Sequence, residues 1–188
     1  MAQTWRVTDE PRRKEPRKPR PPLDGEGLER LALFYAGRFA TTRAKLRTYL
    51  TRKLRERGWG GDGEPPVERL VERFAELGYV DDKAFADSRA ASLGRRGYGA
   101  RRVKAALDGA GIDEADSAEA REAAKAGAWE AALRFAERKR IGPFAADEPD
   151  RAGREKAFAA MLRAGHPMDI ARRVVTARPG NIPESDAF

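Results

Sequence analysis

Residues 77–86 read LGYVDDKAFA, and this stretch decides the fold because one helix is expected to end in it and another to begin. Gly78 follows an apolar pattern over residues 67–77 with the i, i+3, i+4, i+7 spacing of a helix. Asp81 stands where an N-cap is expected. Carboxylates at the start of a helix accept hydrogen bonds from its free N–H groups and interact favourably with the positive end of the helix dipole. We therefore expect a structural motif, and not a catalytic acid pair, made of Gly78, Tyr79, Asp81, Asp82 and Phe85.

Helical spacing continues outward from this motif in both directions. Helices are expected over residues 28–36, 42–57, 67–77, 82–93, 100–110 and 118–140, with two more near Phe158 and Val174. Glycine and proline separate several of these segments, as at Gly142 and Pro143. The sequence therefore predicts an all-α fold.

A glycine followed by a bulky residue closes a helix three times. These pairs are Gly58-Trp59, Gly111-Ile112 and Gly165-His166, which lie 53 and 54 positions apart. A fixed period of this kind indicates units in a row, each burying part of its surface on a neighbour. The expected divisions are a disordered, basic, proline-rich tail at 1–24, a partial first repeat at 25–59, a second repeat at 65–112, a third repeat at 117–176 and a frayed end at 177–188.

The composition favours a polyanionic partner. The 188 residues include 38 Lys and Arg against 30 Asp and Glu, which gives a formal charge of +8 and a pI near 10.0. A positive field accelerates encounter with phosphates, and binding releases their counterions. Because the sequence has no apolar run long enough for a membrane span and no export signal, we expect a cytoplasmic protein without a membrane partner.

No motif in the sequence predicts catalysis or a cofactor. Residues 58–63 match G-x-G-x-x-G, but a basic helix precedes them and two prolines follow, so we interpret them as a flexible loop. His166, the only histidine, has no cysteine and no second histidine with which to bind a metal or activate a nucleophile. We therefore expect no enzyme activity, no cofactor and no metal.

Basic residues are grouped along the chain. Residues 28–57 hold nine basic and two acidic side chains and residues 83–104 hold seven and one, whereas residues 58–82 hold two and seven. Two positive segments at equivalent places in successive repeats can line one groove and follow phosphate or acidic groups. The candidate contact residues are Arg43, Lys45, Arg47, Arg95, Arg96, Tyr98, Arg101, Arg102 and Lys104.

The motif at 77–86, together with residues 97–103, Leu107 and Gly111-Ile112, resembles the RecX family of RecA regulators over about residues 28–176. Val80, His166 and the basic tail depart from the family pattern. The resemblance implies an elongated, curved array of tandem three-helix repeats that lies in the groove of the RecA filament on single-stranded DNA. It further implies that the protein, which we expect to be a monomer, inhibits filament extension, ATP hydrolysis and strand exchange and so modulates recombinational repair.

The alternative is a plain nucleic-acid-binding protein, for example a helix-turn-helix regulator that acts directly on DNA or RNA. The helix at 100–110 could serve as its recognition helix, although it carries no Asn or Gln for bidentate contacts with adenine. Affinity that depends on the nucleotide sequence would favour this alternative. A passive structural adaptor is a third possibility, which the grouped charge makes less attractive.

Overall fold

The computed structural model describes residues 21–185, so the predicted tail up to residue 20 and the last three residues lie outside the described part of the chain. Within that part, all regular elements are helices. They are α1 (Gly25–Arg38), α2 (Arg43–Arg57), α3 (Val67–Glu76), α4 (Asp82–Arg95), α5 (Ala100–Asp108), α6 (Glu114–Ala126), α7 (Ala128–Lys139), the 3₁₀-helix η1 (Gly142–Phe144), α8 (Arg151–Arg163) and α9 (Met168–Thr176). None of these helices combines the length and the apolar character that crossing a membrane requires.

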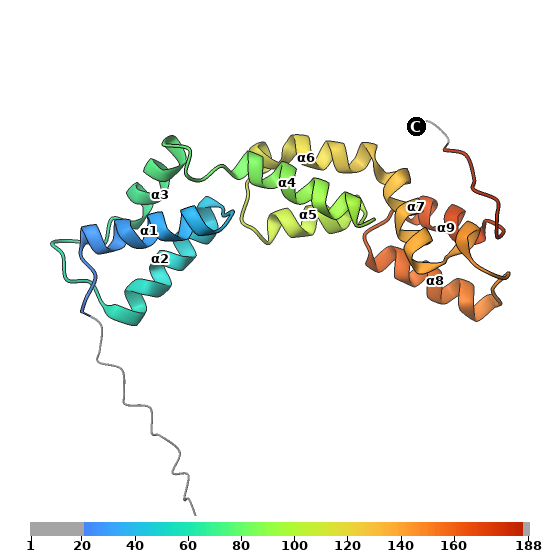
Figure 1. The fold of residues 1–188 in the computed structure, drawn as a ribbon, viewed down its shortest axis with the longest axis horizontal. Coiled ribbons are helices and arrows are strands. Elements are labelled where there is room, and N and C mark those ends of the chain that lie inside the picture. Colours follow the sequence, from blue (N-terminus) through green and yellow to red (C-terminus); the bar gives the residue numbers. More distant parts are fainter. Residues whose placement is uncertain (1–20, 186–188) are drawn as a thin grey trace, which may run out of the picture.

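The helices form three bundles of three, each around its own apolar core. The first core lies among α1–α3, the second among α4–α6 and the third among α7–α9. Leu50 and Val71 are fully buried in the first core, Leu107 in the second, and Met161 and Val174 in the third. Figure 1 shows the three units in a row as an elongated arch, with α2, α5 and α8 along its lower, concave edge. The predicted all-α, curved array of three-helix repeats is confirmed.

The unit boundaries differ from those expected from the sequence. α3 packs on α2 and completes the first unit through Val71 and Phe74, although its sequence position suggested the second repeat. α6 completes the second unit through Ala120, and Gly127 separates it from α7, so residues 118–140 form two helices. Helical spacing predicts where helices form, but the third helix of each unit is assigned by contacts between distant segments.

The recurring glycine marks the end of the second helix in every unit. Gly58, Gly111 and Gly165 follow α2, α5 and α8 with φ of 80°, 72° and 94°. Glycine adopts this left-handed conformation at little cost, which lets the chain turn toward the third helix. The next residue packs inward, because Ile112 and His166 are buried and Trp59 is half-buried. The spacing of 53 and 54 residues between these glycines therefore identifies structurally equivalent positions in the three units.

Residues 21–24 are held against the first unit, although composition suggested that they belong to the tail. Leu23 is 1% exposed. Its N–H donates to Gly58 O at 2.9 Å, and the Gly60 N–H donates to Leu23 O at 2.9 Å. Asp24 caps α1 by accepting from the Gly27 N–H at 2.8 Å. One leucine in a basic, proline-rich stretch is too local a signal to move the predicted boundary, which explains the difference.

The chain beyond α9 carries no further helix within the described residues. It nevertheless touches the third unit, because the Gly180 N–H donates to Pro143 O at 2.8 Å. The segment expected to be frayed is therefore attached at this point.

Candidate functional site

The two aspartates of the 77–86 stretch cap two different helices. Asp81 accepts from the Ala84 N–H at 2.8 Å and so caps α4, the helix that follows it. Asp82 is buried and accepts from the N–H of Arg43, the first residue of α2, at 2.9 Å. The stretch therefore links the first unit to the second, in addition to starting a helix.

Arg43 lies at the centre of this joint. Its guanidinium pairs with four carboxylates, which belong to Asp82 at 3.4 Å, Glu72 and Asp113 at 3.9 Å each, and Asp116. Burial alone lowers the pKa of Arg43, but the charges of Asp82, Asp116 and Glu72 outweigh burial and raise the pKa above its ordinary value. The charge of Arg43, a candidate contact residue, is thus compensated within the chain.

The other two candidate residues of α2 also have partners. Arg47 Nε lies 2.7 Å from both carboxylate oxygens of Glu68, and this hydrogen bond raises the pKa of Arg47 and lowers that of Glu68. Lys45 Nζ lies 4.2 Å from the Phe85 ring centroid. Burial, together with the nearby charge of Arg89, lowers the pKa of Lys45. α2 therefore offers less free charge than its sequence suggests.

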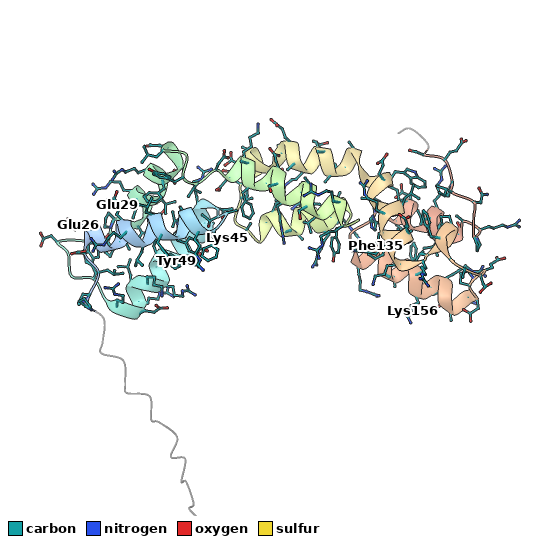
Figure 2. The ribbon with its side chains drawn as sticks, viewed as in Figure 1. Glu26, Glu29, Lys45, Tyr49, Phe135 and Lys156 are labelled. Atoms are coloured by element: carbon teal, nitrogen blue, oxygen red, sulfur yellow. The ribbon has the colours of Figure 1, made fainter. Side chains whose placement is uncertain are left out.

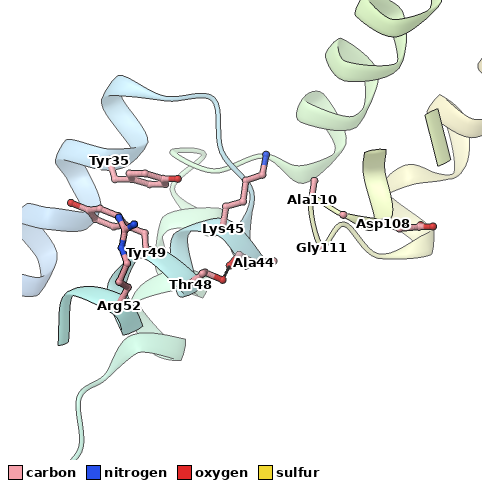
Figure 3. A pocket seen from close by; sticks show the side chains of 10 residues that line it. Tyr35, Ala44, Lys45, Thr48, Tyr49, Arg52, Asp108, Ala110 and Gly111 are labelled. Carbon is pink, nitrogen blue, oxygen red and sulfur yellow. Dashed lines mark hydrogen bonds between the residues drawn. The ribbon is translucent and has the colours of Figure 1, made fainter. Parts of the chain in front are cut away.

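A groove of about 490 Å³ separates α2 from the end of α5. Tyr35 and Tyr49 form one wall, with their rings stacked 4.2 Å apart between centroids and 12° apart in orientation. Residues 108–111 form the facing wall, and the Lys45 side chain extends between the two (Figure 3). The groove is open and aromatic on one side, and it lies at the joint between the first and second units.

Arginines gather around Tyr98, where the second and third units meet. The guanidinium carbons of Arg96, Arg102 and Arg138 lie 5.2, 5.9 and 5.7 Å from the Tyr98 ring centroid, within the range of cation–π contacts. A groove of about 310 Å³ beside the ring is lined by Arg89, Arg96 and Arg102. We call these four residues, Arg89, Arg96, Arg102 and Arg138, the Tyr98 arginine cluster. Among residues 21–185, none of the four forms a salt bridge with a carboxylate.

The remaining candidate residues lie on the exposed surface near this cluster. Arg95 lines a groove of about 390 Å³ on another side of Tyr98. Arg101 donates from Nη2 to Leu162 O at 3.1 Å, which ties it to the third unit. Lys104 pairs with Asp108 at 2.8 Å. The structure thus separates the predicted set into one group at the first joint and another at the second.

Two members of the cluster were not predicted from the sequence. Arg89 lies on α4, seven residues and about two turns before Arg96, the residue that caps the end of this helix, so a helical projection could have found it. Arg138 lies in the last turn of α7, as Arg95 does in the last turn of α4. Aligning the first helices of the units could have found Arg138.

Backbone contacts hold the second and third units together around the cluster. The Gly99 N–H donates to Ala164 O at 3.0 Å, and the Arg101 N–H donates to Gly165 O at 3.2 Å. His166 is fully buried, and its Nε2 lies 3.1 Å from Gly97 O. Because a carbonyl only accepts, Nε2 carries the proton in this bond. Burial lowers the pKa of His166 to about 4, so the ring is neutral at pH 7, and it packs in the joint.

Charge is distributed by helix position within the units. The second helices α2, α5 and α8 carry seven, three and four basic residues, with one acidic residue each. By contrast, the third helices α3 and α6 carry more acids than bases. Figure 2 shows Lys45 and Tyr49 on α2 and Lys156 on α8, along the lower side of the arch. The concave edge, along which α2, α5 and α8 lie, is therefore rich in basic side chains, although the third helix α9 also carries two bases against one acid.

These features define a class of protein, a helical-repeat protein whose three-helix units lie in a row and whose second helices are rich in basic residues. No protein-family model matches the chain. A regulatory protein RecX from Myxococcus xanthus (strain DK1622) is 30% identical over 179 residues, which cover 91% of this chain and 95% of that protein. A regulatory protein RecX from Pseudomonas syringae pv. tomato is 30% identical over 137 residues, or 72% of this chain and 83% of that protein. The chain therefore belongs to the RecX family of regulatory proteins.

A solved structure supports the fold. The crystal structure of RecX from Lactobacillus salivarius matches with a TM-score of 0.59 at 20% identity, covering 80% of this chain and 93% of that chain. The relatives are named as regulatory proteins and not as enzymes.

Proposed function

We propose that this protein binds the RecA filament on single-stranded DNA and inhibits its extension, which lowers ATP hydrolysis and strand exchange during recombinational repair in the cytoplasm. Membership of the RecX family supports a regulatory role. The elongated arch supports contact with an extended partner, because each unit adds surface along one direction.

The observation that carries the proposal is the Tyr98 arginine cluster. Arg96 and Arg102 line one groove and have no carboxylate partner among the described residues, so they are available to phosphates. Arg43 and Arg47 also lie in a basic segment of the sequence, but they are already paired with carboxylates of the same chain. Phosphate binding should therefore depend on the joint between the second and third units more than on α2.

The experiment adds the purified protein to preformed RecA filaments on single-stranded DNA and follows ATP hydrolysis and filament length. The parent protein should inhibit both at stoichiometric amounts. The double variant Arg96→Ala/Arg102→Ala should need roughly 30-fold more protein for the same inhibition, if each of the two lost arginine contacts weakens binding by about 1 kcal/mol.

The matched control is Arg47→Ala, which removes an arginine that is already paired with Glu68. It should inhibit the filaments as the parent does. An inactive parent protein would overturn the proposed function, whereas equal loss in Arg47→Ala and in the double variant would overturn the role of the cluster.

Direct binding to free DNA or RNA is the second candidate function, because the Tyr98 arginine cluster can contact phosphates whether or not RecA is present. Its affinity should fall by about 0.7 log unit per log unit of salt for each phosphate contacted on a single strand. A helix-turn-helix mode is less well supported. Such a protein reads bases with the start of its recognition helix, yet the start of α5 contacts Ala164 and Gly165 of the third unit. Binding to RecA alone, without DNA, separates the two candidates, because a protein that contacts only phosphates does not bind it.

A further inference from the structure

Large apolar side chains are exposed together beside the joint of the first two units. Phe34 is 58% exposed, Phe39 49%, Leu77 56% and Tyr79 53%. The Arg38 guanidinium is 5.9 Å from the ring centroids of both Phe34 and Phe39, so one arginine contacts both rings. Single exposed apolar side chains are normal on a protein surface, whereas several that line one groove can mark an interaction site.

Phe39 and Tyr79 line the same groove, which has a volume of about 440 Å³. Its other apolar contributors include Ala36, Ala84 and Phe85, so it spans α1, the loop before α4 and α4 itself. We call this the Phe39–Tyr79 groove. Tyr79 was expected to be part of a structural motif, but half of its surface faces solvent here.

The charges at the groove indicate what the occupant carries. Arg38 lies over Phe39, Arg89 lines the groove, and neither has a salt bridge to a carboxylate among the described residues. Asp81 is the one acid among the lining residues, and its Oδ1 already accepts from the Ala84 N–H. An occupant with an apolar side chain next to a carboxylate would fill the groove and pair with the arginines.

Arg89 also fixes where the occupant lies relative to phosphates. It lines both this groove and the groove of the Tyr98 arginine cluster, so the two sites adjoin. In the proposed partner, the RecA filament on single-stranded DNA, a polypeptide and a chain of phosphates lie side by side. The apolar floor favours the polypeptide at the Phe39–Tyr79 groove, because sites for single-stranded nucleic acid combine stacking aromatics with many cations.

We infer that the Phe39–Tyr79 groove docks a segment of the RecA protomer that carries an apolar side chain beside a carboxylate. This inference rests on the proposed function. Two adjoining surfaces then bind different parts of the filament. The groove contacts RecA, and the Tyr98 arginine cluster contacts the phosphates of the DNA.

The test measures binding of the full-length protein to two probes, RecA alone without DNA and an oligo(dT) strand without RecA. The variant Phe39→Ser/Tyr79→Ser should bind RecA about 10-fold more weakly or worse, as expected for central aromatic anchors, and should bind oligo(dT) within about 2-fold of the parent. A second variant, Arg38→Glu, leaves the apolar core intact and should weaken RecA binding in the same direction.

The matched control is Met168→Ser, which removes an apolar side chain that is 58% exposed on α9, far from the groove. It should bind both probes as the parent does.

Unchanged RecA binding in both groove variants overturns the inference while leaving the proposed function standing. Loss of oligo(dT) binding assigns the groove to nucleic acid, and loss of concentration-dependent self-association in sedimentation assigns it to a second copy of the chain; either result also overturns the inference. A parent that binds neither RecA nor its filament overturns the proposed function itself.

Discussion

Side chains make the hydrogen bonds and ion pairs at the joint between the first and second units, whereas the joint between the second and third units also has direct backbone–backbone hydrogen bonds. At the first joint, Arg43 pairs with carboxylates of other helices and Thr42 Oγ1 donates to Ala110 O at 2.7 Å. At the second joint, Gly99 and Gly165 let the backbones of the second and third units hydrogen-bond directly. Salt screens partly exposed ion pairs but has little effect on steric fit. The same three-helix unit can therefore be connected by an adjustable contact or by a fixed one.

A closely packed glycine lies at each of the two joints. A Cβ added at Gly111 would lie 2.3 Å from the Ala44 Cβ, a side-chain atom. A Cβ added at Gly99 would lie 2.4 Å from both the C and the O atoms of Gly165, which are backbone atoms in the neighbouring unit. The Ala44 Cβ is fixed to its own backbone and cannot move aside either, so neither glycine has room for a side chain; at Gly99, however, the overlap is with the backbone of another unit.

The largest effect is expected for Gly99→Ala. Gly99 has φ of −77°, which alanine adopts freely, so the cost comes from overlap with Gly165 and not from backbone strain. We expect a loss of about 3 kcal/mol in the free energy of unfolding, measured by urea denaturation with circular dichroism. Gly94→Ala is the control, because its Cβ would have no neighbour within 4 Å and a helical alanine should add about 0.5 kcal/mol. Equal midpoints for the two variants would refute the backbone contact.

A second large effect concerns pH, because His166 lies in the same joint. Its pKa is lowered to about 4 in the folded protein, from 6.5, so the unfolded chain takes up a proton first as the pH falls. The protein should lose on the order of 3 kcal/mol of stability between about pH 6.5 and pH 4 from this group. His166→Phe should remove that part of the pH dependence in urea melts. If the variant and the parent show the same slope, His166 is not the titrating group.

A smaller effect is expected at the first joint. Arg43→Ala leaves the buried carboxylate of Asp82 with its backbone hydrogen bond but without the guanidinium. We expect a loss of about 2 kcal/mol at low ionic strength. Because salt weakens the ion pairs of the parent, the difference between parent and variant should shrink as salt is added. A difference that does not change up to 1 M salt, a concentration at which the screening length falls to about 3 Å, would show that the joint is not electrostatic.

The smallest effect is expected for Arg47→Ala. Arg47 and Glu68 are close, with the shortest distance 2.6 Å, but their side chains are 39% and 66% exposed. Exposed pairs are typically worth less than about 1 kcal/mol. A double-mutant cycle with Glu68→Ala, read by urea denaturation, should give a coupling free energy near 0.5 kcal/mol. A coupling as large as the loss from Arg43→Ala would erase the distinction between buried and exposed pairs of α2.

The helices and their repeat could be predicted from the sequence because both depend on local spacing. The heptad-like pattern before Gly78, the cap at Asp81 and the closing glycines are all signals within a few residues. The grouping of helices could not be predicted, because α3 and α6 join their units through contacts that local spacing does not contain.

The candidate site was predicted in part for the same reason. Counting charges finds the basic segments but does not distinguish paired from free arginines. Arg43 is 39 residues from Asp82 and 73 from Asp116, and these distant partners decide that its charge is compensated. Arg102 and Arg138 meet over Tyr98 only because the third unit folds against the second.

The contact of Gly99 with Gly165 sets a rule for anyone who wishes to recombine these repeats. Both sides of that joint are backbone, so neither unit can be adapted to a foreign neighbour by changing side chains alone. Residues 82–176 should therefore be transplanted as one module. The first unit can be exchanged more freely, provided that its replacement begins a helix with an arginine that reaches Asp82.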